Sequence, residues 1–313
     1  MRDTFIRQLT KRAAQDDRIM LVTGDLGFGV LTKYADDFPK QFVNAGVAEQ
    51  NMTGIATGMA LEGKIVFTYS IANFPTLRCL EQIRNDAAYH DANVKIVSIG
   101  GGFSYGALGM SHHATEDLAI MRAIPQVTVL SPGCKWEVIQ ATSALIDMKG
   151  TGFLRLDKSS AGNTSSLNDV FEVGQPRQLR WGSDVTLATT GGILGEVLDA
   201  SHELQNLGIS CDVFSCHTLK PFAFQTILAS VKRTNTLIVI EEHIVGGGLA
   251  GLLSEICMEE HVFPRKFQRL GIRGGFCTTV GSQSFLRQKY GLDSAAIVGS
   301  VRKLLENEPN DDD

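Results

Sequence analysis

A carboxylate stands at the start of a segment that is rich in small residues. Glu49 follows the turn-forming residues Asn44 and Gly46, and apolar residues between Met52 and Leu61 recur at the spacing of a helix. An acidic side chain in a first helical turn has a simple role, because it complements the positive end of the helix dipole. Glu49 is therefore a candidate site residue, with dipole complementarity as the structural alternative.

Two glycines lie four residues apart on the same predicted helix. Glycine costs about 1 kcal/mol relative to alanine inside a helix, and positions four apart share one face. Gly54 and Gly58 therefore indicate a close contact at that face. A neighbouring helix, another subunit or a flat ligand would each make such a contact.

Two adjacent histidines, His112 and His113, lie in a glycine-rich loop after the predicted strand Val94–Ile99. Metal binding is disfavoured because adjacent side chains of an extended segment diverge, and no histidine four residues away adds a ligand. An imidazole at a loop tip is suited to proton transfer or to a hydrogen bond with a substrate oxygen. A solvated loop histidine is the alternative.

Asp25 comes just past the carboxyl end of the predicted strand 18–23, after Gly24. The carboxyl ends of strands are where α/β sheets place groups that bind ligands. A helix cap or turn cap explains an aspartate there equally well, so both interpretations stay open.

Two glycine patterns point to other chemistries. The segment 102–106 matches G-x-S-x-G, the elbow that exposes Ser104 as a nucleophile in serine hydrolases, with Asp212 and His243 as conceivable partners. An elbow passes directly into a helix, whereas the residues after 106 favour a continuing loop. The segment 246–251 matches G-x-G-x-x-G, but 241–245 interrupt the strand-to-helix turn that a dinucleotide site needs.

The composition bounds the class of protein. The chain has 313 residues, a formal net charge of -5, 43% hydrophobic residues and six scattered cysteines. The charge argues against a nucleic-acid binder, and the cysteines lack the spacing of a zinc site or a disulfide framework. No apolar run is long enough for a membrane span. These features predict a cytoplasmic protein that binds neither membranes nor nucleic acid.

Strands alternate with helices along most of the chain, which predicts an α/β protein with two doubly wound domains and mainly parallel sheets. One strand–helix series fills 1–162 and a second fills 181–306. A segment rich in Ser, Gly and Asn marks a linker, placed at 163–180. The acidic end, 307–313, is predicted to be disordered.

Taken in order, several motifs resemble the pyrimidine-binding domain of the transketolase family. They are Gly24-Asp25-Leu26, Asn44-Ala45-Gly46-Val47-Ala48-Glu49-Gln50-Asn51, Thr68-Tyr69-Ser70 and Ser111-His112-His113. The segments 241–243 and 246–249 resemble the C-terminal domain of that family, which also includes 1-deoxyxylulose-5-phosphate synthases and beta subunits of 2-oxo acid dehydrogenases. The resemblance implies thiamine diphosphate and Mg²⁺ as cofactors. The Gly-Asp-Gly segment that holds the metal and diphosphate in the family is missing, so the chain resembles the C-terminal subunit of a split transketolase.

The resemblance also implies roles for individual residues. Glu49 matches the glutamate that hydrogen-bonds the aminopyrimidine and activates the cofactor, and Phe74 is the candidate for stacking on that ring. Asp25, Tyr69 and Ser70 lie in motifs that line the cofactor site. No metal ligand is expected from this chain, because the family places the metal on the diphosphate-binding domain.

His112 matches a family histidine that contacts substrate, while His113 and Arg155 are further candidates for substrate binding. A structural salt bridge is the alternative for Arg155. Transketolases of central metabolism have an Asp four residues before that histidine and another His twelve before it, where this chain has Leu108 and Gly100. These departures predict a specialised sugar substrate, whether modified, amino or nucleotide-linked.

The resemblance implies an enzyme of carbohydrate metabolism that transfers a two-carbon ketol unit, together with a separate N-terminal subunit. The expected assembly is α2β2, with self-association through the helix that carries Gly54 and Gly58. A non-catalytic subunit that only completes or regulates a partner's site is the hypothesis from another class.

Overall fold

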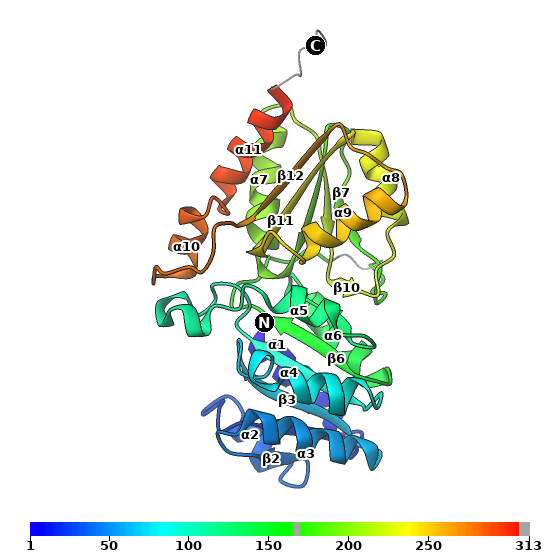
Figure 1. Cartoon of the computed structure of the whole chain (residues 1–313), viewed down its shortest axis with the longest axis vertical. Helices are drawn as coiled ribbons and strands as arrows, with labels where there is room; N and C mark the ends of the chain where they lie inside the picture. The colour runs from blue at the N-terminus through cyan, green and yellow to red at the C-terminus, as the bar shows by residue number, and fades with distance from the viewer. Residues whose placement is uncertain (166–168, 307–313) are drawn as a thin grey trace.

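Strands that are buried on both faces form the centre of each domain of this computed structural model, which describes residues 1–165 and 169–306. Every residue of β1 (Ile19–Thr23), β4 (Val94–Ile99) and β6 (Gly152–Leu156) is buried. Helices must therefore cover both faces of the sheet, which is the usual arrangement of a parallel sheet. Figure 1 shows two such α/β domains, one above the other.

The first sheet has seven strands in the order β10-β5-β6-β4-β3-β1-β2. Its remaining strands are β2 (Phe42–Asn44), β3 (Ile65–Ile71), β5 (Thr128–Leu130) and β10 (Thr218–Lys220). All neighbours are parallel except β10, which is antiparallel to β5.

Helices cover both faces of this sheet. On one face α1 (Arg2–Ala13) and α6 (Lys135–Asp147) pack into a core that includes Phe5 and Leu145. The other face carries α3 (Glu49–Leu61), α5 (Asp117–Ala123) and the helical segment from 77 to 88. The short helix α2 (Thr32–Asp37) precedes β2.

The helical segment 77–88 is divided into three parts. A 3-10 turn (η1, Leu77–Cys79) leads into α4 (Leu80–Gln82) and then into a π-helical segment (η2, Ile83–Ala88). π-helical turns are rare and frequently lie at functional sites.

The second sheet has five strands in the order β12-β11-β8-β9-β7. They are β7 (Arg177–Arg180), β8 (Val185–Thr190), β9 (Cys211–Ser215), β11 (Thr236–Ile244) and β12 (Lys266–Ile272). Only β7 is antiparallel to its neighbour. Its helices are α7 (Leu194–Asn206) after the turn η5 (Gly191–Ile193), α8 (Gln225–Thr234), α9 (Leu249–Glu259), α10 (Gln283–Lys289) and α11 (Ser294–Glu306).

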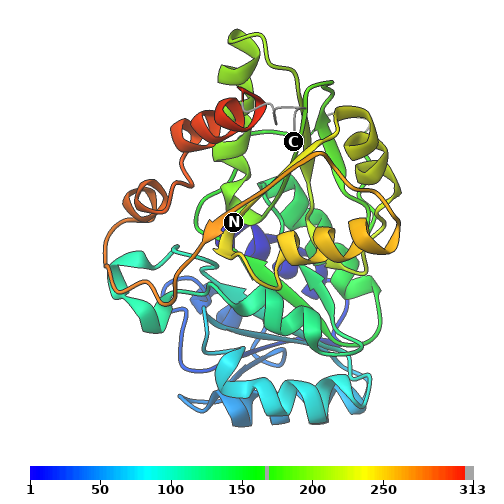
Figure 2. The same ribbon diagram turned by 45° about the horizontal axis from the view of Figure 1, so that its top comes forward.

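The boundary between the domains differs from the predicted one in two ways. β7 lies inside 163–180, the segment predicted as a linker, because it pairs with β9 of the second sheet. β10 follows the second-domain strand β9 in sequence but pairs with β5 of the first sheet, with Thr218 opposite Leu130. Figure 2 shows the two domains in close contact along this border. The predicted acidic tail, 307–313, lies outside the described residues.

Two further observations concern composition. All six cysteines are buried, and none is in a disulfide. Across 1–165 and 169–306, no helix combines the length and the hydropathy that a membrane crossing requires.

Candidate active site

The carboxyl ends of β1 and β2 are tied together by one side chain. Asn44 accepts hydrogen bonds from the backbone N–H groups of Asp25 and Gly46, both at 3.0 Å, and donates to the Asp25 carboxylate at 3.0 Å. Asp25 has a φ of 58° and Gly46 a φ of 75°, so both are in the left-handed region where Asp and Gly are among the tolerated residues. This turn delivers the chain to the start of α3.

Glu49 is the first residue of α3 and has only 6% of its surface exposed. Its Oε1 is 3.2 Å from Nη1 of Arg78, which belongs to η1. Besides its place at the positive end of the helix dipole, the carboxylate is buried beside a cation. The carboxylate faces an open groove, whose lining residues are Val47, Ala48, Glu49, Gln50, Asn51 and Arg78.

Phe74 and His112 continue the cluster from the other side of Arg78. The guanidinium carbon of Arg78 lies 4.1 Å from the centre of the Phe74 ring. The Phe74 ring meets the His112 ring edge-on, with 5.2 Å between their centres. Glu49, Arg78, Phe74 and His112 therefore form one continuous chain of contacts, which joins α3, the turn after β3 and the loop after β4.

The electrostatic environment keeps His112 neutral at pH 7. Partial burial, followed by the nearby His113 and Arg78, lowers the pKa of His112 below its ordinary 6.5. The Ser111 hydroxyl lies 3.0 Å from Nδ1 of His112, which leaves Nε2 as the nitrogen for an external partner. The Tyr105 ring is 6.4 Å from the same imidazole.

The cluster has the chemistry needed to hold a flat, nitrogen-containing ring. A buried carboxylate can bind a ring nitrogen, and the half-buried Phe74 offers an aromatic face. Among residues 1–165 and 169–306, no three His, Cys, Asp or Glu side chains come together in a way that could hold a metal ion. The residues present therefore fit the heterocyclic part of a cofactor.

Comparison with known protein families shows to which of them the chain belongs. Residues 1–163 match the model "Transketolase, pyrimidine binding domain" and residues 174–297 match "Transketolase, C-terminal domain". The chain belongs to the transketolase family.

Its similar relatives include subunits of split transketolases. A 6-deoxy-6-sulfo-D-fructose transketolase subunit of Clostridium sp. is 34% identical over 307 residues, which cover 98% of this chain and 94% of the relative. One of the subunits of an apulose-4-phosphate transketolase from Actinobacillus succinogenes is 30% identical and covers 90% of both chains. Among solved structures, a split-gene transketolase described as an inactive beta4 tetramer superposes with a TM-score of 0.86 at 31% identity, over 97% of both chains.

These matches also identify the two domains of this transketolase-family chain. It has the pyrimidine-binding and C-terminal domains, as predicted, and its α/β fold with two mainly parallel sheets is confirmed. The prediction that the chain belongs to a family of transferases is confirmed as well.

Two residues from the family motifs lie away from the cluster. The Tyr69 ring is buried between the sheet and α1, where it stacks on Phe5 with 6.5 Å between centres. Ser70 is fully buried within the sheet, and its hydroxyl has no hydrogen-bond partner among the described residues. Neither residue is among those that line the groove beside Glu49.

Arg155 forms a structural salt bridge, which the sequence analysis gave as the alternative to substrate binding. Its guanidinium is 1% exposed, lies 3.3 Å from the Asp117 carboxylate and donates to the carbonyls of Ala114 and Glu242. It joins the two domains and does not reach the groove. We therefore do not carry Arg155 forward as a substrate ligand.

His113 is also buried, with Nε2 3.2 Å from the carbonyl of Gly106. Its own carbonyl accepts a hydrogen bond of 2.8 Å from the Asn73 amide. His113 thus fixes the loop, while the adjacent His112 faces the cluster.

Ser104, His243 and Asp212 do not form the catalytic triad that the serine hydrolase alternative requires. Ser104 is buried, and its hydroxyl accepts from the backbone N–H of Lys158 at 3.1 Å. His243 instead accepts from Ala119 N–H at 3.3 Å, and Asp212 pairs with Arg233. No elbow helix follows, because the chain continues as a loop with two short 3-10 turns, η3 (Gly106–Leu108) and η4 (Met110–His112).

The face that carries Gly54 and Gly58 is open. Both glycines are exposed, and a Cβ at either position would meet no atom of the described chain within 4 Å outside the backbone of its own helix. A neighbouring helix of the same chain is therefore not the contact that these glycines serve.

Arg78 is the residue of the cluster that the sequence analysis missed. It lies four residues after Phe74, which is compatible with a shared helical face, but the turn between them is irregular. The sequence analysis also treated Asn44 only as a turn-forming residue and missed its hydrogen bonds to Asp25 and Gly46.

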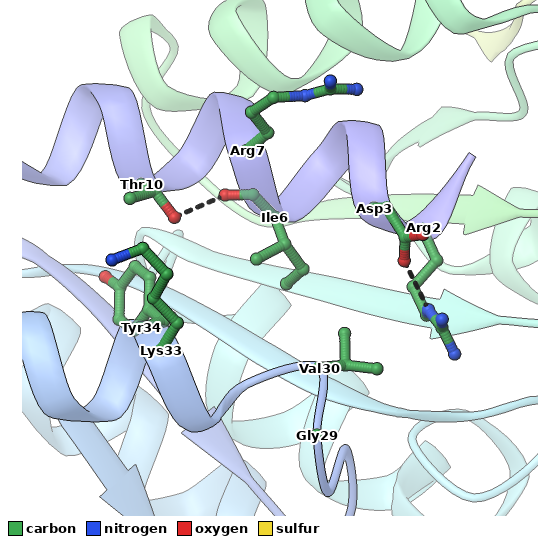
Figure 3. A pocket seen from close by; sticks show the side chains of 9 residues that line it. All are labelled: Arg2, Asp3, Ile6, Arg7, Thr10, Gly29, Val30, Lys33 and Tyr34. Carbon is green, nitrogen blue, oxygen red and sulfur yellow. Dashed lines mark hydrogen bonds and ion pairs between the residues drawn. The ribbon is translucent and has the colours of Figure 1, made fainter.

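A second groove lies elsewhere on the first domain. α1 and the segment 29–34 form its walls, as Figure 3 shows, with the cationic side chains of Arg2, Arg7 and Lys33 at its rim. Arg2 is paired with Asp3 at 2.9 Å. None of its lining residues belongs to the Glu49 cluster.

Proposed function

We propose that this chain is the C-terminal subunit of a split, thiamine-diphosphate-dependent transketolase that transfers a two-carbon ketol unit from a ketose donor to an aldose acceptor. The observation that carries the proposal is the continuous cluster of Glu49, Arg78, Phe74 and His112 at the edge of the pyrimidine-binding domain. A buried carboxylate, an aromatic face and a neutral imidazole are the three groups that this chemistry requires of the subunit.

Each side chain has a defined task. When bound, thiamine diphosphate supplies the carbon nucleophile for attack on a ketose carbonyl. Glu49 would share a proton with a ring nitrogen of the aminopyrimidine, and Phe74 would pack against the ring face. His112 would hydrogen-bond the sugar through Nε2, and Asp25, held by Asn44, would line the same edge.

A separate N-terminal subunit completes the site in this proposal. It would bind the diphosphate and Mg²⁺. The open face of α3 with Gly54 and Gly58 would contact another copy of this chain, which gives an α2β2 assembly. A similar split-gene transketolase is described as a beta4 tetramer, which supports self-association of this kind of chain.

The sugar would be a specialised one. A Cβ at Gly100 would lie 2.2 Å from the Tyr105 ring, so this ring fills the place of the side chain that the common transketolases have at position 100. Lys158 also lies over this ring, with Nζ 3.7 Å from its centre. Relatives named for a sulfonated fructose and for apulose 4-phosphate support a substrate other than the ordinary sugar phosphates of the pentose phosphate pathway.

The experiment is turnover by the complex reconstituted with its N-terminal partner, thiamine diphosphate and Mg²⁺, with 6-deoxy-6-sulfo-D-fructose or apulose 4-phosphate as the donor. Glu49→Gln should reduce kcat by at least about a hundredfold, because removal of a proton-transfer group typically costs that much. Glu62→Gln, at the exposed end of α3, is the matched control. Full activity of Glu49→Gln, or full turnover by the partner alone, would instead show a non-catalytic subunit.

A further inference from the structure

The loop that carries His112 is anchored in the second domain. Phe103, near the start of this loop, is fully buried and belongs to the core of the second domain rather than to the core of its own. Its ring stacks on Tyr290, which follows α10, with 5.3 Å between centres and 25° between planes. The same ring also contacts His113, edge-on at 5.2 Å.

A buried carboxylate of the second domain fixes the backbone at the same point. Glu242, on β11, is 1% exposed and accepts the backbone N–H of Phe103 at 2.5 Å. Gln283 and Arg287 of α10 donate to the same carboxylate at 2.9 and 2.5 Å. The carboxylate therefore joins the loop to α10 through charge-assisted hydrogen bonds.

The middle of the loop touches the segment before α10. The N–H of Gly281 donates to the carbonyl of Gly106 at 3.2 Å. A Cβ at Gly106 would lie 2.5 Å from Leu286 and 2.7 Å from the Gly281 carbonyl, so only glycine allows this approach. His113 bonds the same Gly106 carbonyl, and the loop is thus fixed directly before and after the 3-10 turns that end at His112.

We propose that the second domain has a positioning function in catalysis: Tyr290 and Glu242 hold Phe103, and through it the loop, so that His112 faces the substrate. This inference rests on the role proposed for His112. Neither Tyr290 nor Glu242 contacts the Glu49 cluster, so both act through the loop and are positioning residues.

The test uses the complex with the partner subunit and compares Tyr290→Leu with Tyr290→Phe, because only the second keeps a ring against Phe103. Three quantities are measured. They are KM and kcat for the donor sugar that supports turnover, the Kd of thiamine diphosphate, and amide hydrogen exchange in the segment 103–113, which needs no substrate. Asp212→Asn is the control, since Asp212 is a buried, ion-paired carboxylate of the same domain that lies away from the loop.

Tyr290→Leu should raise the sugar KM about two- to tenfold, the loss expected for one aromatic pair. It should also speed exchange in 103–113 and leave the cofactor Kd unchanged. Tyr290→Phe and Asp212→Asn should match the wild type in all three. Unchanged exchange in 103–113 for Tyr290→Leu overturns the positioning role, and so does an equal loss in Asp212→Asn. A wild-type KM and kcat for His112→Ala would instead refute the proposed role of His112.

Discussion

Arg78 and Glu49 form an ion pair, with 3.2 Å between Nη1 and Oε1, inside the groove where the proposed cofactor ring binds. The same guanidinium lies 4.1 Å from the centre of the Phe74 ring. A planar cation thus makes both contacts that we propose for the aminopyrimidine: one with the carboxylate and one with the aromatic face. Arg78 must therefore move aside when that ring binds.

Replacement of Arg78 should strengthen cofactor binding. The ion pair is half exposed on the Arg78 side, and exposed pairs stabilise by about 0.2–1 kcal/mol. Arg78→Ala should therefore lower the Kd of thiamine diphosphate up to about fivefold, as measured by titration of the complex. Arg84→Ala is the control, because Arg84 is only a neighbour of the cluster in sequence and donates to Asn85. Weaker binding in Arg78→Ala would show that Arg78 holds the cofactor instead.

The pH profile should report His112. Burial, His113 and Arg78 lower its pKa below 6.5, so the imidazole is neutral at pH 7 and gains a proton only in more acidic solution. We expect kcat/KM to fall on the acid side with an apparent pKa below 6.5. His112→Asn should lose that limb and retain reduced activity, whereas the exposed His90→Asn should keep the wild-type profile. An unchanged acid limb in His112→Asn would assign it to another group.

Lys95 should make stability depend on pH above neutrality. It is fully buried on β4, and burial lowers its pKa to about 7, while the unfolded chain has a value of 10.5. Between these values the unfolded state binds more protons, so stability rises with pH.

The measurement is urea unfolding at pH 7 and pH 9. Wild type should gain roughly 2 kcal/mol relative to Lys95→Met over this interval, since one unit of pKa corresponds to about 1.4 kcal/mol. Lys40→Met replaces an exposed lysine and should follow the wild type. A constant difference between wild type and Lys95→Met would show that Lys95 does not titrate in this range.

A large side chain on the open face of α3 should disrupt assembly and not the fold. Nothing in the described chain outside the helix's own backbone lies within 4 Å of a Cβ at Gly58, and leucine favours a helix by nearly 1 kcal/mol over glycine. Gly58→Leu should therefore keep or raise the melting temperature while shifting the oligomer to smaller species in light scattering. Gly299→Leu, at an equally open position of α11, should leave the oligomer unchanged. An unaltered oligomer in both variants would remove this helix from the interface.

The sequence predicted the α/β class and three members of the cluster. Glu49 and His112 each lie in a motif or loop that local patterns mark, and Phe74 was implied by the family resemblance. Arg78 could not be predicted. Its place depends on the 3-10 and π-helical turns between 77 and 88, which no periodicity marks. The burial of Arg155 between the domains could not be predicted either. It depends on contacts with Asp117 and Glu242, two residues that are distant from Arg155 in sequence.

The pairing of β10 with β5 sets a limit on how a gene for this protein can be divided. Thr218 follows β7, β8 and β9 of the second sheet along the chain, yet it lies opposite Leu130 in the first sheet. A break in the polypeptide anywhere from 157 to 217 would assign one strand of the first sheet to a different gene product. The first sheet is therefore complete only when the part of the chain that forms the second domain contributes β10.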